Sequence, residues 1–496
     1  MRRGPATAQS LGSTAARGAV VTMGGQAARM VIQTLGVVVL SRLVEPSEFG
    51  LFAMVLVIVG IGEVLRDFGL SAAVIQSREI TQQQQSNLFW INTAIGCLLC
   101  VVLIACSGLV AGFYGQPELA KVAVAVSGVF VLNGMSTQYR AALNRELRFT
   151  VLAVSEVVSM AIGLVAGIGL AAAGFGVWSL VAQQLVQAAA ILIMTVFYGR
   201  WLPGLPSSGA EMKPLLVFGW NFGCMQLINY LSRNIDTIVI GRRFGAEPLG
   251  FYNRAYQLLT LPLNQINGPA TKVAFPVLSR IADDPRKYDQ FLLRGQSALL
   301  HVVAFGFSFT IALAGPLVSL ILGDQWVASA DIFQALAISG IVQTAAFGTY
   351  WVFLSKGLSG ANLRCTLATK SLLVVSVIAG SNWGVIGVAV GYSVATIVGW
   401  PIGLLWIRAV ANAPVKAMAV NCIRTVGVYG IAAVAAAFAA DLYPGDGSVD
   451  ILAGLSAYMA VIALIWVFYQ PFRADIQEIY YIRRLLSAPK ISGDAG

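Results

Sequence analysis

Charged residues are scarce in this chain of 496 residues. They make up 11% of it, whereas hydrophobic residues make up 57% and the mean hydropathy is +0.77. Because soluble domains carry about 25% charged residues, the composition argues against a soluble enzyme. It also excludes an intrinsically disordered chain, which would combine low hydrophobicity with high charge. The composition is that of a membrane protein.

The chain also has very little histidine and lacks a common nucleotide-binding signature. The chain has one histidine, His301, and no GxxxxGK[ST] pattern. A histidine-based metal cluster, a Ser-His-Asp arrangement and ATP hydrolysis are therefore not expected. Cys97 and Cys100 stand one helical turn apart in an apolar segment, which favours packing over redox or metal chemistry. We expect no enzyme activity, no catalytic residue, no metal and no cofactor.

The hydrophobic residues occur in blocks of about 20, the length that an α-helix needs to cross a hydrocarbon core of about 30 Å. Short polar connectors separate the blocks. The pattern predicts an all-α polytopic membrane protein with about 14 transmembrane helices. The predicted spans are 19–41, 50–75, 88–111, 118–138, 150–172, 175–197, 214–240, 247–275, 293–321, 329–354, 362–380, 383–407, 418–440 and 451–470.

The net charge of +10 follows from topology and requires no nucleic-acid partner. With the N-terminus inside, most of the 32 lysines and arginines fall in tails and connectors on the cytoplasmic side. The opposite side carries Arg42, Arg242 and Arg243. This asymmetry obeys the positive-inside rule. It predicts a multi-pass protein of the cytoplasmic (inner) membrane with both termini in the cytoplasm.

The spans divide into two halves of six, joined by a connector rich in Pro, Gly and Ser at 198–213. At an offset of 200 residues the second half weakly matches the first. The matched pairs are Gln26 with Gln226, Val39 with Val239, Arg42 with Arg242, Gly50 with Gly250, and Phe52 with Tyr252. Even numbers of spans imply parallel repeats, which usually enclose a substrate site. We predict two parallel six-helix lobes around a central cavity, plus two C-terminal helices.

The chain is thus predicted to contain six segments. They are a cytoplasmic tail (1–18), an N-terminal lobe (19–197), a cytoplasmic linker (198–213), a C-terminal lobe (214–410), helices 13 and 14 (411–470) and a cytoplasmic tail (471–496). Within the last segment, 475–486 fits an interfacial helix and a solvated tail equally well. In span 8, Pro262 and Pro269 predict a bent or broken helix.

Polar side chains inside the predicted spans form stripes at helical spacing. Span 1 carries Gln26, Arg29 and Gln33, span 7 carries Gln226, Asn229, Arg233 and Asp236, span 2 carries Glu63, Arg66 and Asp67, and span 8 carries Arg254, Gln257, Asn264 and Lys272. A charge at the bilayer centre costs about 2.5–3.5 kcal/mol, so these residues should face a cavity or a partner. We predict a hydrophilic cavity between the halves, whose cations suit an anionic substrate.

Internal ion pairs are the competing interpretation for some of these residues. Arg66 has Glu63 and Asp67 as neighbours, and such a pair is expected to be structural. Arg233 has Asp236 within one turn, which leaves pairing and substrate binding evenly balanced.

The remaining cations have no acid close by on their own helix. Arg29 lacks one within a turn, which favours a functional role. Arg254 and Lys272 lie near opposite ends of span 8. For each of them, two interpretations are equally supported: the side chain extends to the membrane interface, or it binds substrate.

Three carboxylates are candidates for coupling transport to an ion: Asp236, Glu63 and Glu156, the last near the cytoplasmic end of span 5. Proton or sodium exchange would need one that titrates in step with the cavity, whereas driving by consumption of the product would need none. Glu156 is also placed to pair with a neighbouring helix. His301, in span 9, is interpreted as a packed, neutral residue rather than a proton relay.

Five stretches of the chain resemble a known family. They are SRLVEPSEFGLFAMV (41–55), RDFGLSAAVIQ (66–76), GFYNRAYQLLTLPLNQI (250–266), FPVLSRIADD (275–284) and GDQWVASA (323–330). With the layout of spans, they make the chain similar to the MOP superfamily of multidrug, oligosaccharidyl-lipid and polysaccharide exporters. Within it, the chain resembles Wzx-type polysaccharide flippases of the colanic-acid and xanthan exporter branch, over about residues 19–470.

The resemblance implies that undecaprenyl-pyrophosphate-linked oligosaccharide is moved from the inner to the outer leaflet by alternating access, for exopolysaccharide or other cell-surface polysaccharide synthesis. Arg29, Arg233 and Arg254 would contact the pyrophosphate, with Lys272 as a further cation of the cavity. The polar lining for the sugars would be Gln26, Gln33, Gln226, Asn229, Gln257 and Asn264. Membrane lipids, a polysaccharide polymerase and a chain-length regulator are expected partners.

Three alternatives stay open. A lipid II-type flippase would share the fold and the charge. A drug or cation antiporter of the same superfamily would share the fold but favour an acidic cavity. A membrane enzyme of glycan assembly would need long external loops and clustered catalytic residues, and neither is found in the sequence.

Overall fold

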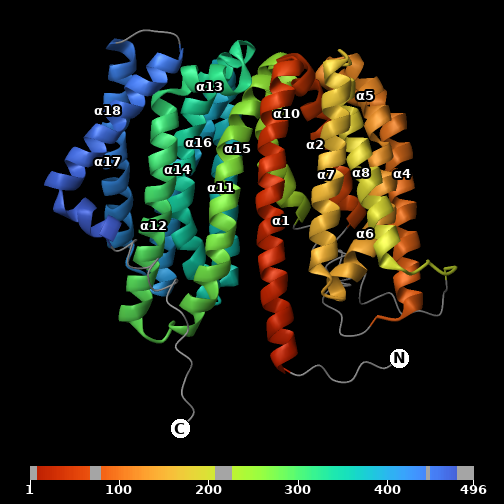
Figure 1. Ribbon diagram of the computed structural model, residues 1–496, viewed down its shortest axis with the longest axis horizontal. Coiled ribbons are helices and arrows are strands. Elements are labelled where there is room, and N and C mark those ends of the chain that lie inside the picture. Colours follow the sequence, from red (N-terminus) through yellow and green to blue (C-terminus); the bar gives the residue numbers. More distant parts are fainter. Residues whose placement is uncertain (1–7, 68–79, 207–225, 443–446, 478–496) are drawn as a thin grey trace. The chain divides into compact units, whose positions relative to one another are not determined.

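The computed structural model describes residues 8–67, 80–206, 226–442 and 447–477, with side chains from residue 24 onward (Figure 1). The regular elements in these ranges are helices. By compactness the chain forms two units, Met1–Asn253 and Arg254–Gly496, called here the first and second unit. The predicted all-α class is confirmed.

The first unit contains long helices that pack side by side. They are α1 (Ala8–Leu43), α2 (Pro46–Asp67), α4 (Gln82–Tyr114), α5 (Glu118–Val126), α6 (Gly128–Arg145), α7 (Phe149–Ala172), α8 (Val177–Gly199), a helix at 226–233, α10 (Ile235–Phe244) and the start of α11 (Ala246–Arg280). Helix α7 packs against α1 and α8, and α6 packs against α4 and α8. Helices α1, α6, α7 and α8 therefore form one cluster.

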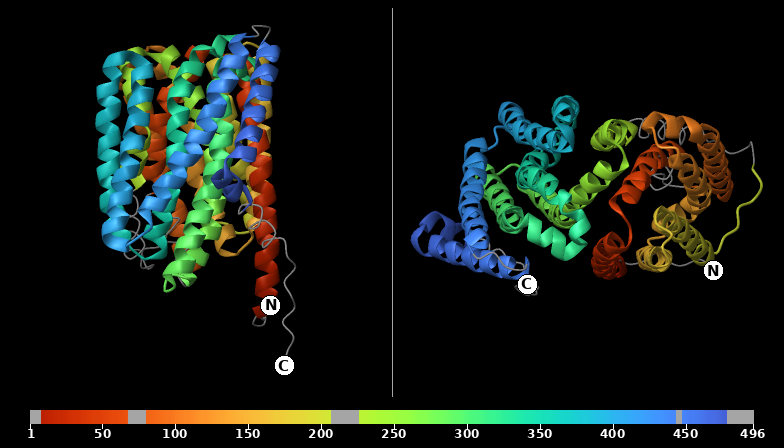
Figure 2. Two further views of the ribbon diagram at one scale, coloured as in Figure 1. Left: turned by 90° about the vertical axis from the view of Figure 1, so that its left-hand side faces the viewer. Right: turned by 90° about the horizontal axis from the view of Figure 1, so that it is seen from above.

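The second unit contains the rest of α11 and the helices that follow it. They are α12 (Pro285–Ala312), α13 (Ala314–Leu322), the short 3₁₀ helix η1 (Asp324–Trp326), α14 (Ala328–Ser355), α15 (Ser359–Gly380), η2 (Ser381–Trp383), α16 (Gly384–Ala411), α17 (Val415–Leu442), α18 (Gly447–Phe468) and a helix at 470–477. Helix α12 packs against α14 and α17, and α17 and α18 lie side by side at the edge of the unit (Figure 2).

The described helices overlap the predicted spans, but several extend well beyond them. Helix α1 begins at Ala8, eleven residues before the predicted start at 19, and α12 begins at Pro285, eight residues before the predicted start at 293. Within the described residues three spans are broken: at Ser127 between α5 and α6, at Asn234 between the helix at 226–233 and α10, and at Leu313 between α12 and α13. Ten stretches of the described chain are long and apolar enough to cross a membrane, and one of them, 359–411, joins α15 to α16. Helices α1 and α11 are also long enough, but they are not among the ten stretches found in the described residues. The polytopic class is confirmed, and the count of fourteen stays a prediction.

Several helix ends follow from local sequence signals. Thr81 begins α4 with a capping box: its hydroxyl accepts from the Gln84 amide at 3.2 Å, and the Gln84 side chain accepts from the Thr81 amide at 3.0 Å. Asp284 caps α12, whose first residue is Pro285. Hydrogen bonds from the Lys287 side chain and backbone hold the pKa of the Asp284 carboxyl below its usual value. These polar caps begin α4 six residues before the predicted span 88–111 and α12 eight residues before the predicted span 293–321.

Helix α11 corrects one expectation. It is a continuous helix from Ala246 to Arg280, although Pro262, Pro269 and Pro276 lie inside it. The alternative of a broken helix is therefore wrong, and the alternative of a bent helix stays a prediction. Prolines remove single backbone hydrogen bonds, and membrane helices tolerate this because neighbouring groups satisfy the freed carbonyls.

The starts of α2 and α11 contact each other through two glycines at the repeat offset of 200 residues. A Cβ atom on Gly50 would overlap the carbonyl oxygen of Ala246, and one on Gly250 would overlap the carbonyl oxygen of Pro46. Because Pro46 and Ala246 are the first residues of the two helices, the contact is reciprocal. The weak internal match of the sequence thus has a structural counterpart within the first unit.

The predicted linker is described only in its first half. Its residue Trp201 lies 5.0 Å from Tyr139 and 6.3 Å from Phe89, measured between ring centroids, and Trp90 donates a hydrogen bond of 2.8 Å to the Gly204 carbonyl. This part therefore packs on α4 and α6. Residues 207–213 lie outside the described residues, and the boundary between compact units falls at Asn253. The division into lobes at 198–213 stays a prediction.

Candidate functional site

A polar pocket of about 310 Å³ lies within the first unit, between α1, α6, α7 and α8. Its lining residues are Arg29, Asn133, Arg140, Glu156, Ser159, Met160, Gln184, Gln187, Ala188 and Ile191. Small residues let the helices approach: Gly25 on α1 faces Ala153 on α7, and Gly163 on α7 faces the backbone of α8 at Gln183. The approach brings polar side chains from four helices to one place.

Glu156 is bonded to two arginines in this pocket. One carboxylate oxygen pairs with Arg29 of α1, and the other pairs with Arg140 of α6 at 3.1 Å. The exposed fractions are 26% for the Glu156 side chain, 29% for Arg29 and 46% for Arg140. All three side chains therefore reach the open space, and together they carry one net positive charge.

This lining suits a phosphorylated glycan. Guanidinium groups bind phosphate oxygens in a planar fork. The side chains of Gln184, Gln187 and Ser159 can donate to and accept from sugar hydroxyls. The pocket thus combines groups for an anion with groups for a sugar.

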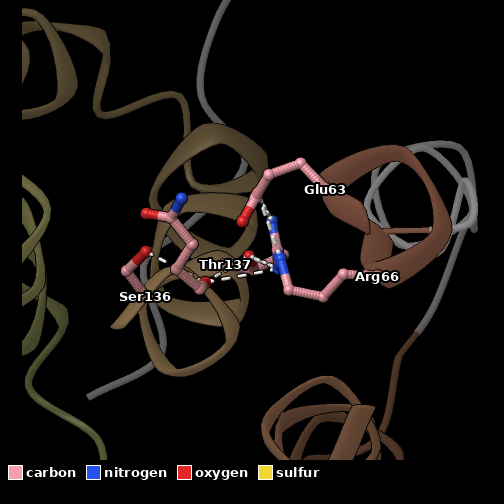
Figure 3. A network of polar contacts seen from close by, with 5 residues as sticks. Glu63, Arg66, Ser136 and Thr137 are labelled. Atoms are coloured by element: carbon pink, nitrogen blue, oxygen red, sulfur yellow. Dashed lines mark hydrogen bonds and ion pairs between the residues drawn. The ribbon is translucent and has the colours of Figure 1, made fainter. Parts of the chain in front are cut away.

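A buried network lies next to the pocket (Figure 3). Arg66 of α2 is paired with Glu63 at 2.8 Å and donates to the Thr137 hydroxyl and, at 3.3 Å, to the Asn133 carbonyl of α6. The predicted pairing of Arg66 with Glu63 is confirmed. Since Asn133 also lines the pocket, the network fixes one of its walls. Glu63 has a structural partner, and its assignment as a coupling carboxylate stays a prediction.

The predicted polar stripe of span 7 does not line the polar pocket. Asp236 is 2% exposed, and it accepts hydrogen bonds from the Tyr252 hydroxyl at 2.7 Å and the Thr237 amide at 2.8 Å. Arg233 is exposed and forms no pair with Asp236. The structural alternative for Arg233, an ion pair with Asp236, is therefore wrong. Gln226 is exposed and Asn229 is half-buried.

Arg254 lies in the second unit, where it is 6% exposed. Its guanidinium donates to Gln257 at 2.6 Å and lies 5.6 Å from the ring centroid of Trp326. Trp326 is fully buried and belongs to η1. Arg254 therefore does not snorkel to an interface. Two stretches that carry the family resemblance, 250–266 and 323–330, contact each other through this pair.

The remaining predicted residues have no place in the polar pocket. Lys272 and Asn264 are exposed on α11, Gln33 is exposed on α1, and Gln26 is half-buried there. None of them is among the residues that line it. Their assignment to a central cavity stays a prediction, as do those of Arg233 and Arg254.

His301 is buried in the second unit among partners that the sequence did not indicate. Its Nδ1 lies 3.2 Å from the Tyr429 hydroxyl, and its Nε2 lies 3.5 Å from Asp475 of the helix at 470–477. Asp475 also pairs with Arg424 of α17 at 2.6 Å. The first residues of the predicted interfacial helix are thus helical and bonded to the unit, and residues 478–486 lie outside the described residues.

A second pocket, of about 300 Å³, lies in the second unit between α11, α12, α13 and α14. Its walls are apolar apart from Thr310, with Pro262 and Ile266 of α11 facing Gly306 and Phe307 of α12. A cavity without polar partners does not hold ordered water. Its chemistry is therefore opposite to that of the polar pocket.

Sequence reasoning missed part of the polar pocket. Arg140 lies two residues beyond the predicted span 118–138, but α6 extends to Arg145 and carries it into the site. Gln184 and Gln187 are spaced three apart on span 6, so the stripe rule applied to spans 1 and 7 would have found them. The predicted pairing of Glu156 with a neighbouring helix is confirmed, but nothing in the sequence indicated Arg29, 127 residues earlier, as its partner.

Comparison with solved structures shows the fold. The fold matches the lipid II flippase MurJ in an inward closed conformation, with a TM-score of 0.67 and 14% identity over 90% of this chain and 98% of that one. It also matches an inward-facing multidrug resistance MATE family transporter of the MOP superfamily, with a TM-score of 0.61 and 15% identity over 78% of this chain and 94% of that one. The chain has the MOP transporter fold.

Sequence comparison then shows the family. The family described as polysaccharide biosynthesis protein matches residues 39–331, and the chain belongs to it. One relative is the lipopolysaccharide biosynthesis protein WzxC of Escherichia coli (strain K12), 28% identical over 75% of this chain and 77% of that one. Another is the teichuronic acid biosynthesis protein TuaB of Bacillus subtilis (strain 168), 32% identical over 63% of this chain and 68% of that one.

Proposed function

We propose that this protein flips undecaprenyl-pyrophosphate-linked oligosaccharide from the inner to the outer leaflet of the cytoplasmic membrane, for cell-surface polysaccharide synthesis. Membership of the polysaccharide biosynthesis family carries this proposal. The relatives named for lipopolysaccharide and teichuronic acid synthesis support it, as does a further one named for succinoglycan transport in Rhizobium meliloti (strain 1021), 26% identical over 61% of each chain.

The polar pocket fits the hydrophilic part of such a substrate. Arg29 and Arg140 would bind the pyrophosphate, and Gln184 and Gln187 would bind sugar hydroxyls. The predicted residues of spans 7 and 8, with Arg233 and Arg254 as cations, would contribute to substrate binding when the two halves enclose a central cavity. The polyprenyl chain would stay in lipid while one half rocks against the other.

The topology and the partners belong to the same proposal. Charge asymmetry supports an inner-membrane protein with both termini in the cytoplasm. A lipid-linked glycan is the transported partner, and membrane lipids surround the apolar helices. A polysaccharide polymerase and a chain-length regulator are the protein partners that we expect downstream, because flipped repeat units must be joined.

The alternatives differ in cargo. A lipid II-type flippase has the support of the MurJ fold, a likeness that concerns the fold alone. A drug antiporter would bind cations, and the pocket with two arginines and one glutamate disfavours that substrate. For transport coupled to an ion, Glu156 is the best placed of the three candidate carboxylates, whereas driving by consumption of the product would need none.

The test compares cells with and without the gene. We expect loss of surface polysaccharide and accumulation of an undecaprenyl-pyrophosphate oligosaccharide on the cytoplasmic face, whose trapped glycan identifies the cargo. Accumulation of lipid II would favour the alternative flippase. Normal polymer and intermediates together with increased sensitivity to cationic drugs would overturn the proposal in favour of the antiporter.

Site variants extend this test. Arg29→Ala and Arg233→Ala should each reduce export at least about tenfold, the effect of losing one charge-assisted contact. Protein levels should stay near normal, because both side chains are at least partly exposed. Lys121→Ala, an exposed cation outside the stripes, is the matched control. Variants that fail to accumulate in the membrane would show a structural role instead.

A further inference from the structure

Glu156 occupies the positions that an anionic substrate would need. Its two carboxylate oxygens are divided between Arg29 and Arg140, so each guanidinium already has a negative partner. Among the described residues that line the pocket, Glu156 is the one carboxylate. The arginines come from helices α1 and α6, and Glu156 comes from α7, between them.

A phosphate group and this carboxylate compete for the same donors. Each guanidinium presents its N–H groups in a plane and binds one anion best in a two-pronged arrangement. The pocket holds about 310 Å³ and keeps all three charged side chains partly exposed. An incoming phosphate can therefore reach the arginines, but its full contact with them requires that Glu156 moves away.

We propose that Glu156 is a resident counter-ion, which the phosphate of the transported lipid displaces from Arg29 and Arg140 and which returns to them when the substrate leaves. The identity of the phosphate rests on the proposed function. In the empty state the carboxylate neutralises one of two neighbouring positive charges and holds the arginines in position. On release it competes with the substrate, so tight binding does not prevent turnover.

The role makes Glu156 a positioning residue that also lowers anion affinity. A purely structural carboxylate would support the arginines, so its neutralisation would weaken anion binding. A resident counter-ion opposes binding, so its neutralisation strengthens it. The sign of the change in affinity therefore separates the two roles.

The experiment measures binding of inorganic pyrophosphate to the full chain in lipid nanodiscs by titration calorimetry. Glu156→Gln keeps the shape and removes the charge, and we expect it to bind about tenfold more tightly than the unaltered protein. Glu146→Gln is the matched control, because Glu146 pairs with Arg148 at 3.6 Å and lies outside the pocket lining. Arg29→Gln should weaken binding in either background.

Equal or weaker binding by Glu156→Gln would overturn the proposal, and so would failure of both proteins to bind pyrophosphate. If Glu156→Gln does not fold, Glu156→Asp serves instead: its shorter side chain cannot hold both guanidiniums equally well, and it should bind pyrophosphate more tightly than the unaltered protein. The cargo is tested separately by the lipid-linked intermediates in cells, so a wrong counter-ion role and a wrong function give different results.

Discussion

Helices α2 and α11 occupy equivalent places in the two halves of the sequence, yet they resemble each other only at their starts. Both begin at the same repeat offset, and each presents a glycine, Gly50 or Gly250, to the first residue of the other. This reciprocal contact depends only on the absence of a side chain at two positions. The repeat can therefore be recognised at the two helix starts even though the side chains around the glycines differ in chemical type.

Four turns further along, the two helices differ completely. Helix α2 carries Glu63 and the buried Arg66, bonded to each other and to α6. The same repeat positions on α11 are Leu263 and Ile266, and Ile266 lines the apolar pocket. The repeat is thus visible in the backbone contact between the helix starts, whereas the later residues of each helix match the partners that surround them.

The strongest test of the reciprocal contact replaces each glycine with leucine. Gly50→Leu and Gly250→Leu should destabilise the protein equally, by about 3 kcal/mol each, because a Cβ atom would overlap a backbone carbonyl that cannot move aside alone. Thermal unfolding in detergent and abundance in the membrane measure the loss. Gly108→Leu on α4, with no atom within 4 Å of its Cβ position, is the control. If only one glycine proves sensitive, the contact is not reciprocal.

The polar side of the comparison is tested at Arg66. Arg66→Ala should cost about 2–3 kcal/mol, because Glu63 and the Thr137 hydroxyl lose their buried partner. The equivalent change on α11, Ile266→Ala, should cost only about 1 kcal/mol, since one side of Ile266 already faces open space. Both are read from thermal unfolding. Equal losses would contradict the difference between the two helices.

A smaller effect on stability is expected at Tyr252, which stands at the repeat position of Phe52. Tyr252→Phe removes the hydroxyl that donates to the buried Asp236 and should cost about 1–2 kcal/mol. Tyr230→Phe loses only a long hydrogen bond of 3.3 Å to the Leu56 carbonyl, and it should change stability less. The order of the two melting temperatures checks the prediction, and the reverse order would show that Asp236 is held mainly by its backbone bond to Thr237.

The smallest effect is expected in the apolar pocket. Gly306→Leu should leave stability unchanged or raise it by up to about 1 kcal/mol, because leucine favours a helix more than glycine and nothing lies within 4 Å of the new Cβ. Gly340→Leu is the contrasting variant, since its Cβ would lie 2.6 Å from Leu259 and 2.9 Å from Phe307. A clear loss of stability for Gly306→Leu would mean that the pocket closes during folding.

The interior of the candidate site shows where prediction from sequence stopped. The stripe on span 1 identified Arg29, and one-turn spacing identified the pair of Arg66 with Glu63, because neighbours along a helix are fixed by its 3.6-residue period. The partner of Arg29 lies on another helix, and no period relates the two. Arg140 was missed because it lies beyond the predicted end of span 4 at residue 138, whereas α6 continues to Arg145.

The all-helical membrane class, the approximate places of the apolar helices and the resemblance to polysaccharide exporters could all be predicted from the amino-acid sequence. These properties depend on the length of apolar segments and on local spacing, which a linear chain records directly. The bond of Asp236 to Tyr252 rather than Arg233, and the joining of two arginines by Glu156 in one pocket, became known from the packing of the helices. Such contacts depend on which helices pack together and how each is rotated, and in lipid that choice follows small residues and side-chain fit rather than hydrophobicity.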